Sequence, residues 1–185
     1  MVTHIDLKTV LRRTVCELFS NLVTRPTGAA VRGGIEQQLA LVENPTLTVI
    51  DFSHVGLLDF SCADEIVAKL LLRHVAEADP GHEVYFLFRG ISETHLDAIE
   101  TVLARHRLAL VTDDGSGCVR LVGELDDRQR ATWEAIFRLG CAVPDDIAGE
   151  AGIPAEDAGK VMEDLWRRRL VMRNEQGYVA VGATA

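Results

Sequence analysis

Two short runs of β-branched and aromatic residues most constrain how this chain can fold. The runs are TLTVIDF at residues 46–52 and EVYFLF at residues 83–88. Neither run alternates apolar with polar residues, and this is typical of strands that are buried on both faces. Between them, CADEIVAKLLLRHVAEA carries apolar residues at helical spacing. The order strand, helix, strand therefore predicts parallel strands joined by a right-handed crossover.

The flanking segments extend this pattern. Apolar residues at three- and four-residue spacing predict helices over residues 5–19, from Pro26 to about residue 42, and over residues 92–106. The runs RLALVT and CVRLVGEL, on either side of the turn DDGSG, predict two strands of a hairpin. We therefore expect an α/β fold with a largely parallel sheet and an antiparallel pair at its end.

The pattern changes after residue 123. Three amphipathic segments, ELDDRQRATWEAIFRLG, VPDDIAGEAG and IPAEDAGKVMEDLWRRRLV, are followed by MRNEQGYVAVG, which alternates around a Gln-Gly turn. Three helices followed by a hairpin are the order of a small winged helix-turn-helix domain. The predicted organisation is an N-terminal helix at 1–20, an α/β domain at 21–123 and a winged helix at 124–185.

Composition limits the function classes. The chain is 48% apolar and 25% charged, and no window has the roughly 18 uninterrupted apolar residues of a membrane span. The start MVTHIDLKTVLRR lacks the apolar region of a signal peptide, and the four cysteines form no CxxC pair. We expect a cytoplasmic protein with reduced thiols, no metal and no cofactor. The net charge of −9 opposes unaided binding to a phosphate backbone.

The tripeptide DFS occurs twice, at 51–53 and at 59–61. Asp51, Ser53 and His54 are too close together on an extended chain to converge as a hydrolase triad, so we predict no catalytic residue. Ser61 precedes a helical stripe, and Ser61-x-x-Asp64 is similar to a capping box. The same serine is also a candidate for a phosphorylation switch. A phosphoserine at this position would repel the carboxylates of Asp59, Asp64 and Glu65.

The segment TVIDFSHVGLLDFSCADEIV resembles the centre of the STAS domain of anti-sigma factor antagonists. In that family a buried strand leads through an Asp-Ser-Ser/Thr-Gly loop into a helix, and a GHKL-type kinase binds there and phosphorylates the Ser or Thr before the glycine. The resemblance covers roughly residues 20–123. It implies that Asp59 is the motif aspartate and Ser61 the phosphorylation candidate, while Phe60 and Cys62 replace the Ser and Gly of the motif.

Two functions follow as expectations. The first is a non-enzymatic signalling protein that acts by partner switching, binding a GHKL-type kinase or an anti-sigma factor. The expected partner contacts are Ser53, His54, Asp59, Cys62, Asp64, Glu65 and Lys69. The second is a transcription regulator that binds DNA through the winged helix, with a sensing or dimerising STAS-like part. The candidate DNA contacts are Lys160, Arg167, Arg168, Arg169 and Arg173. A homodimer is compatible with both functions.

Overall fold

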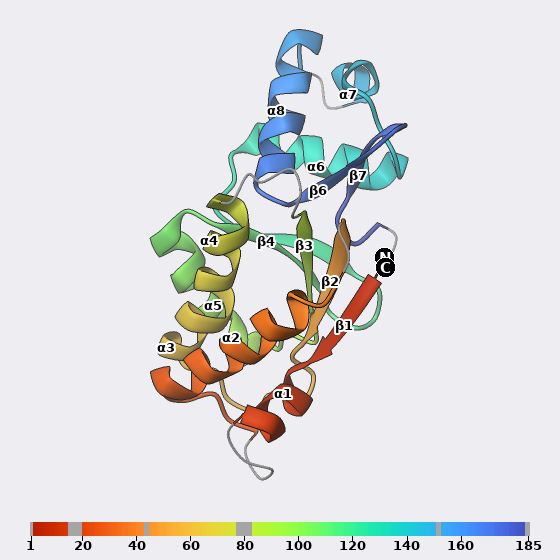
Figure 1. The fold of residues 1–185 in the computed structure, drawn as a ribbon. Helices are drawn as coiled ribbons and strands as arrows, with labels where there is room; N and C mark the ends of the chain where they lie inside the picture. Colours follow the sequence, from red (N-terminus) through yellow and green to blue (C-terminus); the bar gives the residue numbers. More distant parts are fainter. Residues whose placement is uncertain (1, 15–19, 43–44, 77–82, 151–152, 184–185) are drawn as a thin grey trace.

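The computed structural model describes residues 2–14, 20–42, 45–76, 83–150 and 153–183 (Figure 1). Its centre is a five-stranded sheet in the order β1-β2-β3-β4-β5. Strands β1 to β4 are parallel, and β5 runs antiparallel to β4. The strands are β1 Val2–Asp6, β2 Thr46–Asp51, β3 Val84–Arg89, β4 Ala109–Asp113 and β5 Val119–Gly123. The predicted α/β class, with a largely parallel sheet and an antiparallel pair at its end, is confirmed.

One face of the sheet is covered by the helices that connect the parallel strands (Figure 1). These helices are α1 Leu7–Thr14, α2 Arg25–Leu39, α3 Phe60–Ala63, η1 Asp64–Ala68, α4 Lys69–Ala76 and α5 Glu93–His106. The strands follow one another in sequence order, and successive right-handed crossovers then place every helix on the same side. Their apolar faces close a core with Ile50, Phe86 and Phe88 of the central strands.

The opposite face is covered by the C-terminal third of the chain. Its elements are α6 Asp127–Leu139, α7 Pro144–Glu150 and α8 Ala155–Arg167, followed by the antiparallel pair β6 Val171–Asn174 and β7 Gly177–Ala180. Trp133 and Met162 belong to one core cluster with Val49 and Leu87 of the sheet. The central strands are therefore apolar on both faces because different parts of the chain bury each face.

The expectation of a helix over residues 5–19 is wrong at its start. Residues Val2–Asp6 form β1, an edge strand that pairs in parallel with β2, and the helix begins only at Leu7. Only Ile5 of this strand is buried, so the segment lacks the apolar run that marks a central strand. Residues 15–19 of the prediction lie outside the described residues.

Candidate functional site

A loop at the carboxyl end of β2 leads from Asp51 to the first turn of α3. Backbone bonds fix the loop against the segment that precedes α2: Gly56 N donates to the Ser20 carbonyl at 2.8 Å, and Leu22 N donates to the Leu57 carbonyl at 2.7 Å. The side-chain amide oxygen of Asn21 accepts from Leu57 N at 3.2 Å. The loop is thus held in place by main-chain contacts and by the buried side chains of Phe52, Val55 and Leu58, while the side chains of Ser53, His54 and Leu57 are exposed.

Helix α5 supports the same loop through His95, which is buried. The Nδ1 atom of its ring accepts from Ser92 N at 3.2 Å, so the proton lies on Nε2, which is 3.4 Å from the Gly56 carbonyl. His95 is therefore a structural residue that joins the start of α5 to the loop.

The surface of the loop combines polar and apolar side chains. Ser53 and His54 are exposed, as their proposed role as partner contacts requires. Leu57 is 55% exposed although it is a large apolar residue. Leu57 is not among the predicted partner contacts, because a lone leucine in a loop gives no periodic signal.

Asp59 is the N-cap of α3, so the prediction that Ser61 caps this helix is wrong. The helix begins at Phe60, and the carboxylate of Asp59 accepts from Cys62 N at 2.8 Å. Ser61 lies inside the first turn, where its hydroxyl donates to Asp59 Oδ1 at 2.9 Å. Both residues are good caps, and the sequence alone does not decide which of the two starts the helix.

The ionisation of the first turn follows from these bonds. Burial alone would raise the pKa of Asp59, but the donors of Cys62 and Ser61 outweigh burial and lower the pKa below its ordinary value. Burial raises the pKa of the Cys62 thiol to about 11. Cys62 is therefore a neutral thiol at pH 7, and it donates to the Thr24 carbonyl at 3.0 Å.

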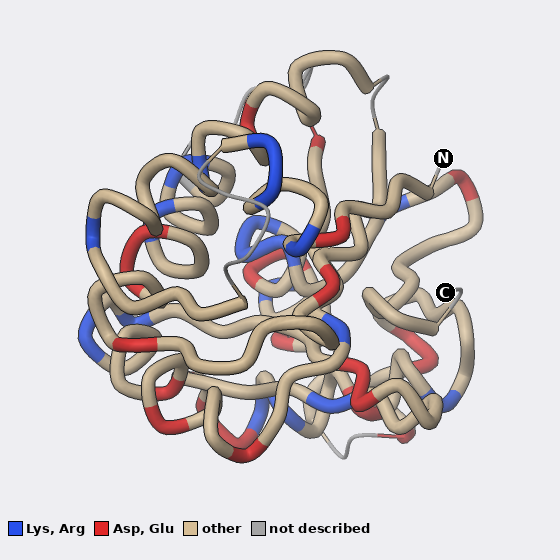
Figure 2. Tube along the Cα trace, turned by 90° about the horizontal axis from the view of Figure 1, so that it is seen from below, with Lys and Arg blue, Asp and Glu red and all other residues tan. Residues whose placement is uncertain are grey.

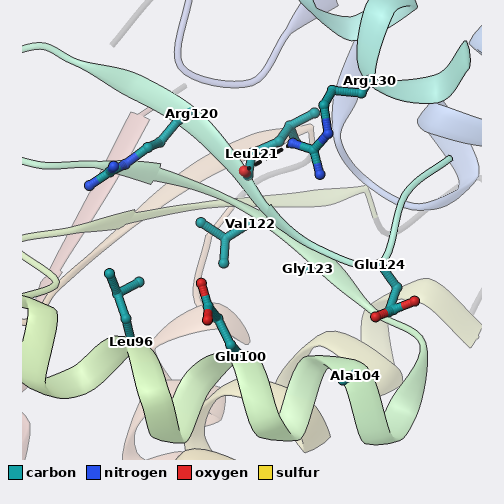
Figure 3. A pocket seen from close by; sticks show the side chains of 9 residues that line it. All are labelled: Leu96, Glu100, Ala104, Arg120, Leu121, Val122, Gly123, Glu124 and Arg130. Carbon is teal, nitrogen blue, oxygen red and sulfur yellow. Dashed lines mark hydrogen bonds between the residues drawn. The ribbon is translucent and has the colours of Figure 1, made fainter. Parts of the chain in front are cut away.

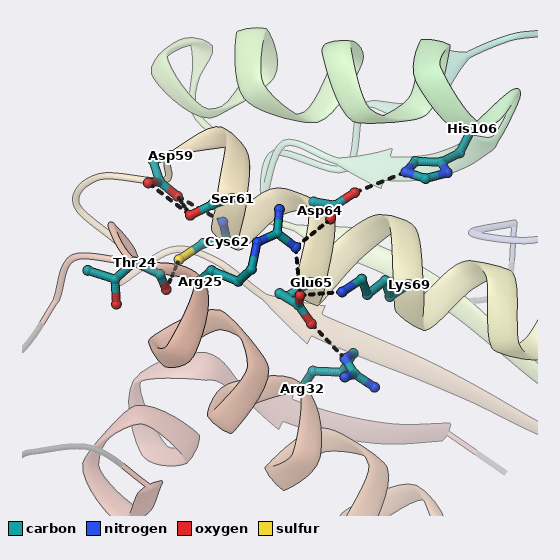
Figure 4. Close-up of polar contacts among 10 residues, drawn as sticks. All are labelled: Thr24, Arg25, Arg32, Asp59, Ser61, Cys62, Asp64, Glu65, Lys69 and His106. Atoms are coloured by element: carbon teal, nitrogen blue, oxygen red, sulfur yellow. Dashed lines mark hydrogen bonds and ion pairs between the residues drawn. The ribbon is translucent and has the colours of Figure 1, made fainter.

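Behind the loop, the helix widens into a π-helical turn, η1, that begins with two buried carboxylates (Figure 4). Arg25 Nη1 lies 2.8 Å from both Asp64 Oδ2 and Glu65 Oε1, and so bridges the two side chains. Glu65 also contacts Arg32 at 3.3 Å and Lys69. The pair is therefore surrounded by cations from α2 and α4.

His106 of α5 completes the cluster, with its Nε2 2.9 Å from Asp64 Oδ1. For Asp64 and Glu65 alike, burial would raise the pKa, but the hydrogen bonds from the neighbouring cations lower it. Both groups are therefore charged at neutral pH, and they connect α2, η1 and α5 in one ionic network.

These contacts correct part of the predicted partner surface. Cys62, Asp64 and Glu65 are buried, and Lys69 is partly exposed but bound to Glu65. Cys62, Asp64 and Glu65 therefore stabilise the helix from inside, whereas the side chain of Lys69 is 42% exposed. The expected contacts that reach the surface are Ser53 and His54, with Asp59 and Ser61 partly exposed.

A close helix approach makes the network possible. A Cβ atom at Gly28 of α2 would lie 2.9 Å from the Cα atom of Cys62 and 3.1 Å from the Cβ atom of Glu65. Only glycine therefore allows α2 to lie this near the first turns of the neighbouring helix, where Arg25 and Arg32 reach the carboxylates.

The basic residues proposed for DNA contact do not form one free surface. Lys160 lies 3.4 Å from Asp157, and Arg167 lies 3.3 Å from Glu163. Figure 2 shows acidic residues interspersed with basic ones along the chain. Each of these two cations therefore has a carboxylate neighbour on its own helix.

The other three arginines contact the protein itself. Arg168 donates to the carbonyls of Glu124 at 2.5 Å and Arg107 at 3.4 Å, and Arg173 lies over the ring of Tyr178. Arg169 is 6% exposed, so the prediction that it contacts DNA is wrong. Its guanidinium carbon lies 5.5 Å from the Tyr85 ring centre and 5.6 Å from that of Trp166.

Three side chains that contact these carboxylates were not predicted from the sequence, namely Arg25, Arg32 and His106. They lie 33 to 42 positions from the carboxylates that they contact, and no local pattern records such pairs. Within the described residues, no group of three or more histidine, cysteine, aspartate or glutamate side chains could hold a metal ion, and no helix is long and apolar enough to cross a membrane. No protein-family model, curated protein or solved structure matches this chain.

Proposed function

We propose that this chain is a non-enzymatic signalling protein that binds a partner protein through the loop and first helical turn at residues 53–61. The observation that carries the proposal is the exposed Leu57 on a loop whose backbone is fixed by hydrogen bonds. A rigid loop loses little conformational entropy on binding, and an exposed apolar side chain gains by being covered. The resemblance to STAS domains makes a GHKL-type kinase or anti-sigma factor the expected partner.

Ser61 would act as the switch of this surface. Its hydroxyl donates to Asp59, whose carboxylate is charged at neutral pH. Phosphorylation would remove that donor and place a charge of about −1.5 to −2 beside the carboxylate. The repulsion would disturb the cap of α3, which is worth about 1 kcal/mol, and would place new charge within the partner contact.

Calorimetric titration with a purified GHKL-type ATPase tests the proposal. Leu57→Ser should weaken binding about tenfold or more, since it removes the apolar contact. Leu41→Ser is the matched control. Leu41 is 86% exposed and follows the C-terminal end of α2, whereas the loop contacts the segment before the N-terminal end of this helix. Equal affinities for wild type and Leu57→Ser would contradict the proposed surface, and mass spectrometry without phosphate on Ser61 after incubation with ATP would contradict the switch.

A second candidate function is DNA binding by a winged helix made of α6 to α8 with β6 and β7. It is favoured by the exposure of Lys160 and Arg167, whose side chains are 78% and 68% exposed on α8. A gel shift with promoter DNA at rising salt tests this candidate. A DNA-binding protein should lose affinity steeply as salt rises, because each phosphate contact releases counterions.

A further inference from the structure

The strand at one end of the sheet, β5, has an unpaired outer edge. It pairs with β4 on its inner side, and among the described residues no strand pairs with it on its outer side. Glu124 N donates to the Leu108 carbonyl. Since hydrogen-bonded pairs alternate along an antiparallel ladder, the backbone groups of Val119, Leu121 and Gly123 point away from β4.

A groove lies on each side of this edge. The first, about 430 Å³, runs between β5 and α5, and Figure 3 shows the carboxylate of Glu100 beneath Val122 at its centre. The second, about 520 Å³, lies between β5 and α6 and is lined by Trp133 and Phe137 among others. An added strand would point successive side chains into alternate grooves, because side chains alternate between the faces of a sheet.

Charges of both signs line the edge. Glu100, Glu124 and Glu134 contribute negative charge to the two grooves, and Arg120, Arg130 and Arg138 contribute positive charge. A partner strand of one sign would meet repulsion from half of these groups. A second copy of the same strand, in contrast, runs in the opposite direction across a two-fold axis. An arginine of one copy can then lie beside a glutamate of the other copy, and the same contact is repeated on the other side of the axis.

We propose that two copies of this chain pair through their β5 strands in antiparallel orientation, with Leu121 opposite Leu121 of the second copy. This pairing joins the outward backbone groups of both strands. It places Arg120 opposite Val122 of the second copy, beside that copy's Glu100. A shifted pairing could instead place Arg120 opposite Arg120 of the second copy. That pairing would bring like charges together and is therefore disfavoured.

One side chain restrains this pairing. Arg130 Nη1 donates to the outward carbonyl of Leu121 at 3.4 Å (Figure 3). The bond is long, and charged side chains at a sheet edge commonly oppose pairing with other chains. Arg130 has to leave this carbonyl when the second strand binds, so Arg130→Ala should strengthen the dimer.

Charge reversal in two separate preparations provides the test. Arg120→Glu and Glu100→Arg each place like charges together in a homodimer, so each should raise the dimer dissociation constant about tenfold or more. In an equimolar mixture, the new carboxylate at position 120 of one chain would meet the new guanidinium at position 100 of the other. The native Arg120 and Glu100 would remain paired on the second side. The mixture should therefore dimerise like the wild type.

Sedimentation from about 1 to 300 µM covers the affinity expected of a small interface. Arg13→Glu, an exposed residue of α1, is the control and should leave the dimer unchanged. Circular dichroism checks that each variant is folded. Backbone pairing is read from hydrogen exchange: the amide of Leu121 should gain protection as concentration rises, while that of Val122, already bonded to β4, should not.

Four results would overturn the proposal, three of them seen by sedimentation. These three are a monomer at every concentration, a dimer that is insensitive to both charge reversals, and a mixture that dimerises no better than its components. A dimer whose Leu121 amide stays unprotected would place the interface elsewhere, and it would overturn the proposal as well.

Discussion

The two faces of the sheet bury charged side chains in different ways. On the face covered by α2 and α5, Asp64 and Glu65 receive hydrogen bonds or ion pairs from four side chains on three elements. On the face covered by α8, Arg169 lies between two aromatic rings. Its Nε and Nη1 atoms have no hydrogen-bond partner among the described residues.

The difference separates two structural roles. The carboxylates join helices that are distant in sequence, so the loss of one removes contacts with several of these helices at once. The arginine fills a space between rings, and its long aliphatic stem and planar head pack there much as an apolar side chain would. Neither group reaches a partner, so the exposed loop at 53–61 is the region to which we assign binding.

The largest effect is expected from Glu65→Ala. It removes the contacts with Arg25, Arg32 and Lys69. We expect the free energy of unfolding to fall by about 3 kcal/mol, at the lower end for a broken buried ion pair because the cations are partly exposed. Urea denaturation measures it. Glu163→Ala, which breaks the pair with the exposed Arg167 and a long hydrogen bond from Tyr178, should cost less than about 1 kcal/mol. Equal costs for the two variants would contradict the role of the network.

The same network predicts a dependence on pH. The pKa of Glu65 is lower in the folded protein than its ordinary value, since the bonds from its cations outweigh burial. Its contribution is therefore complete above the ordinary glutamate pKa of about 4.3 and is lost as the pH falls through the folded pKa. The difference in stability between wild type and Glu65→Gln should be largest near pH 7 and should shrink below pH of about 4. A difference in stability between wild type and Glu65→Gln that grows as the pH falls would contradict this prediction.

A smaller loss is expected from Gly28→Ala. The new methyl group would meet the backbone of Cys62 at 2.9 Å, and we expect a loss of about 2 kcal/mol from overpacking. Gly33→Ala is the control on the same helix, because nothing lies within 4 Å of its added Cβ atom. That change should stabilise the protein by about 0.5 to 1 kcal/mol, since alanine favours the helix. Thermal unfolding of both variants should give shifts of opposite sign.

The smallest effect is expected from Arg169→Met. The Nε and Nη1 atoms of this guanidinium have no hydrogen-bond partner among the described residues, so its removal breaks no hydrogen bond of theirs. Methionine keeps the unbranched stem and packs well against aromatic rings. We expect the free energy of unfolding to change by less than about 1 kcal/mol, measured by urea denaturation. A loss of unfolding free energy as large as that expected for Glu65→Ala would contradict the different roles of buried charge on the two faces of the sheet.

The sequence predicts the central strands and the hairpin of β4 and β5 well, but not the other edge strand, β1. The runs around Val49 and Leu87 are continuous because both faces of the sheet are buried. Val2–Asp6 belongs to an edge strand with one buried residue, and Ile5 fits a helical stripe equally well. Strand prediction therefore succeeds where burial is complete or where a turn marks a hairpin, and it fails for β1, which has neither signal.

The sequence identifies the segment of the candidate site but not the contacts within it. The motif around Asp59 and Ser61 contains the N-cap of α3, but the sequence does not decide that Asp59 and not Ser61 is the cap. The burial of Asp64 and Glu65 depends on Arg25, which lies 39 and 40 positions away. Such pairs become neighbours only when the crossover places α2 beside η1.

The most direct test of the proposed function is photo-crosslinking to the partner. A photoreactive side chain at position 57, in the presence of the GHKL-type ATPase, should form a covalent adduct with the ATPase, and the same group at position 160 on α8 should form none. An adduct at position 160 together with none at position 57 would contradict the central claim that the loop at 53–61 is the binding surface.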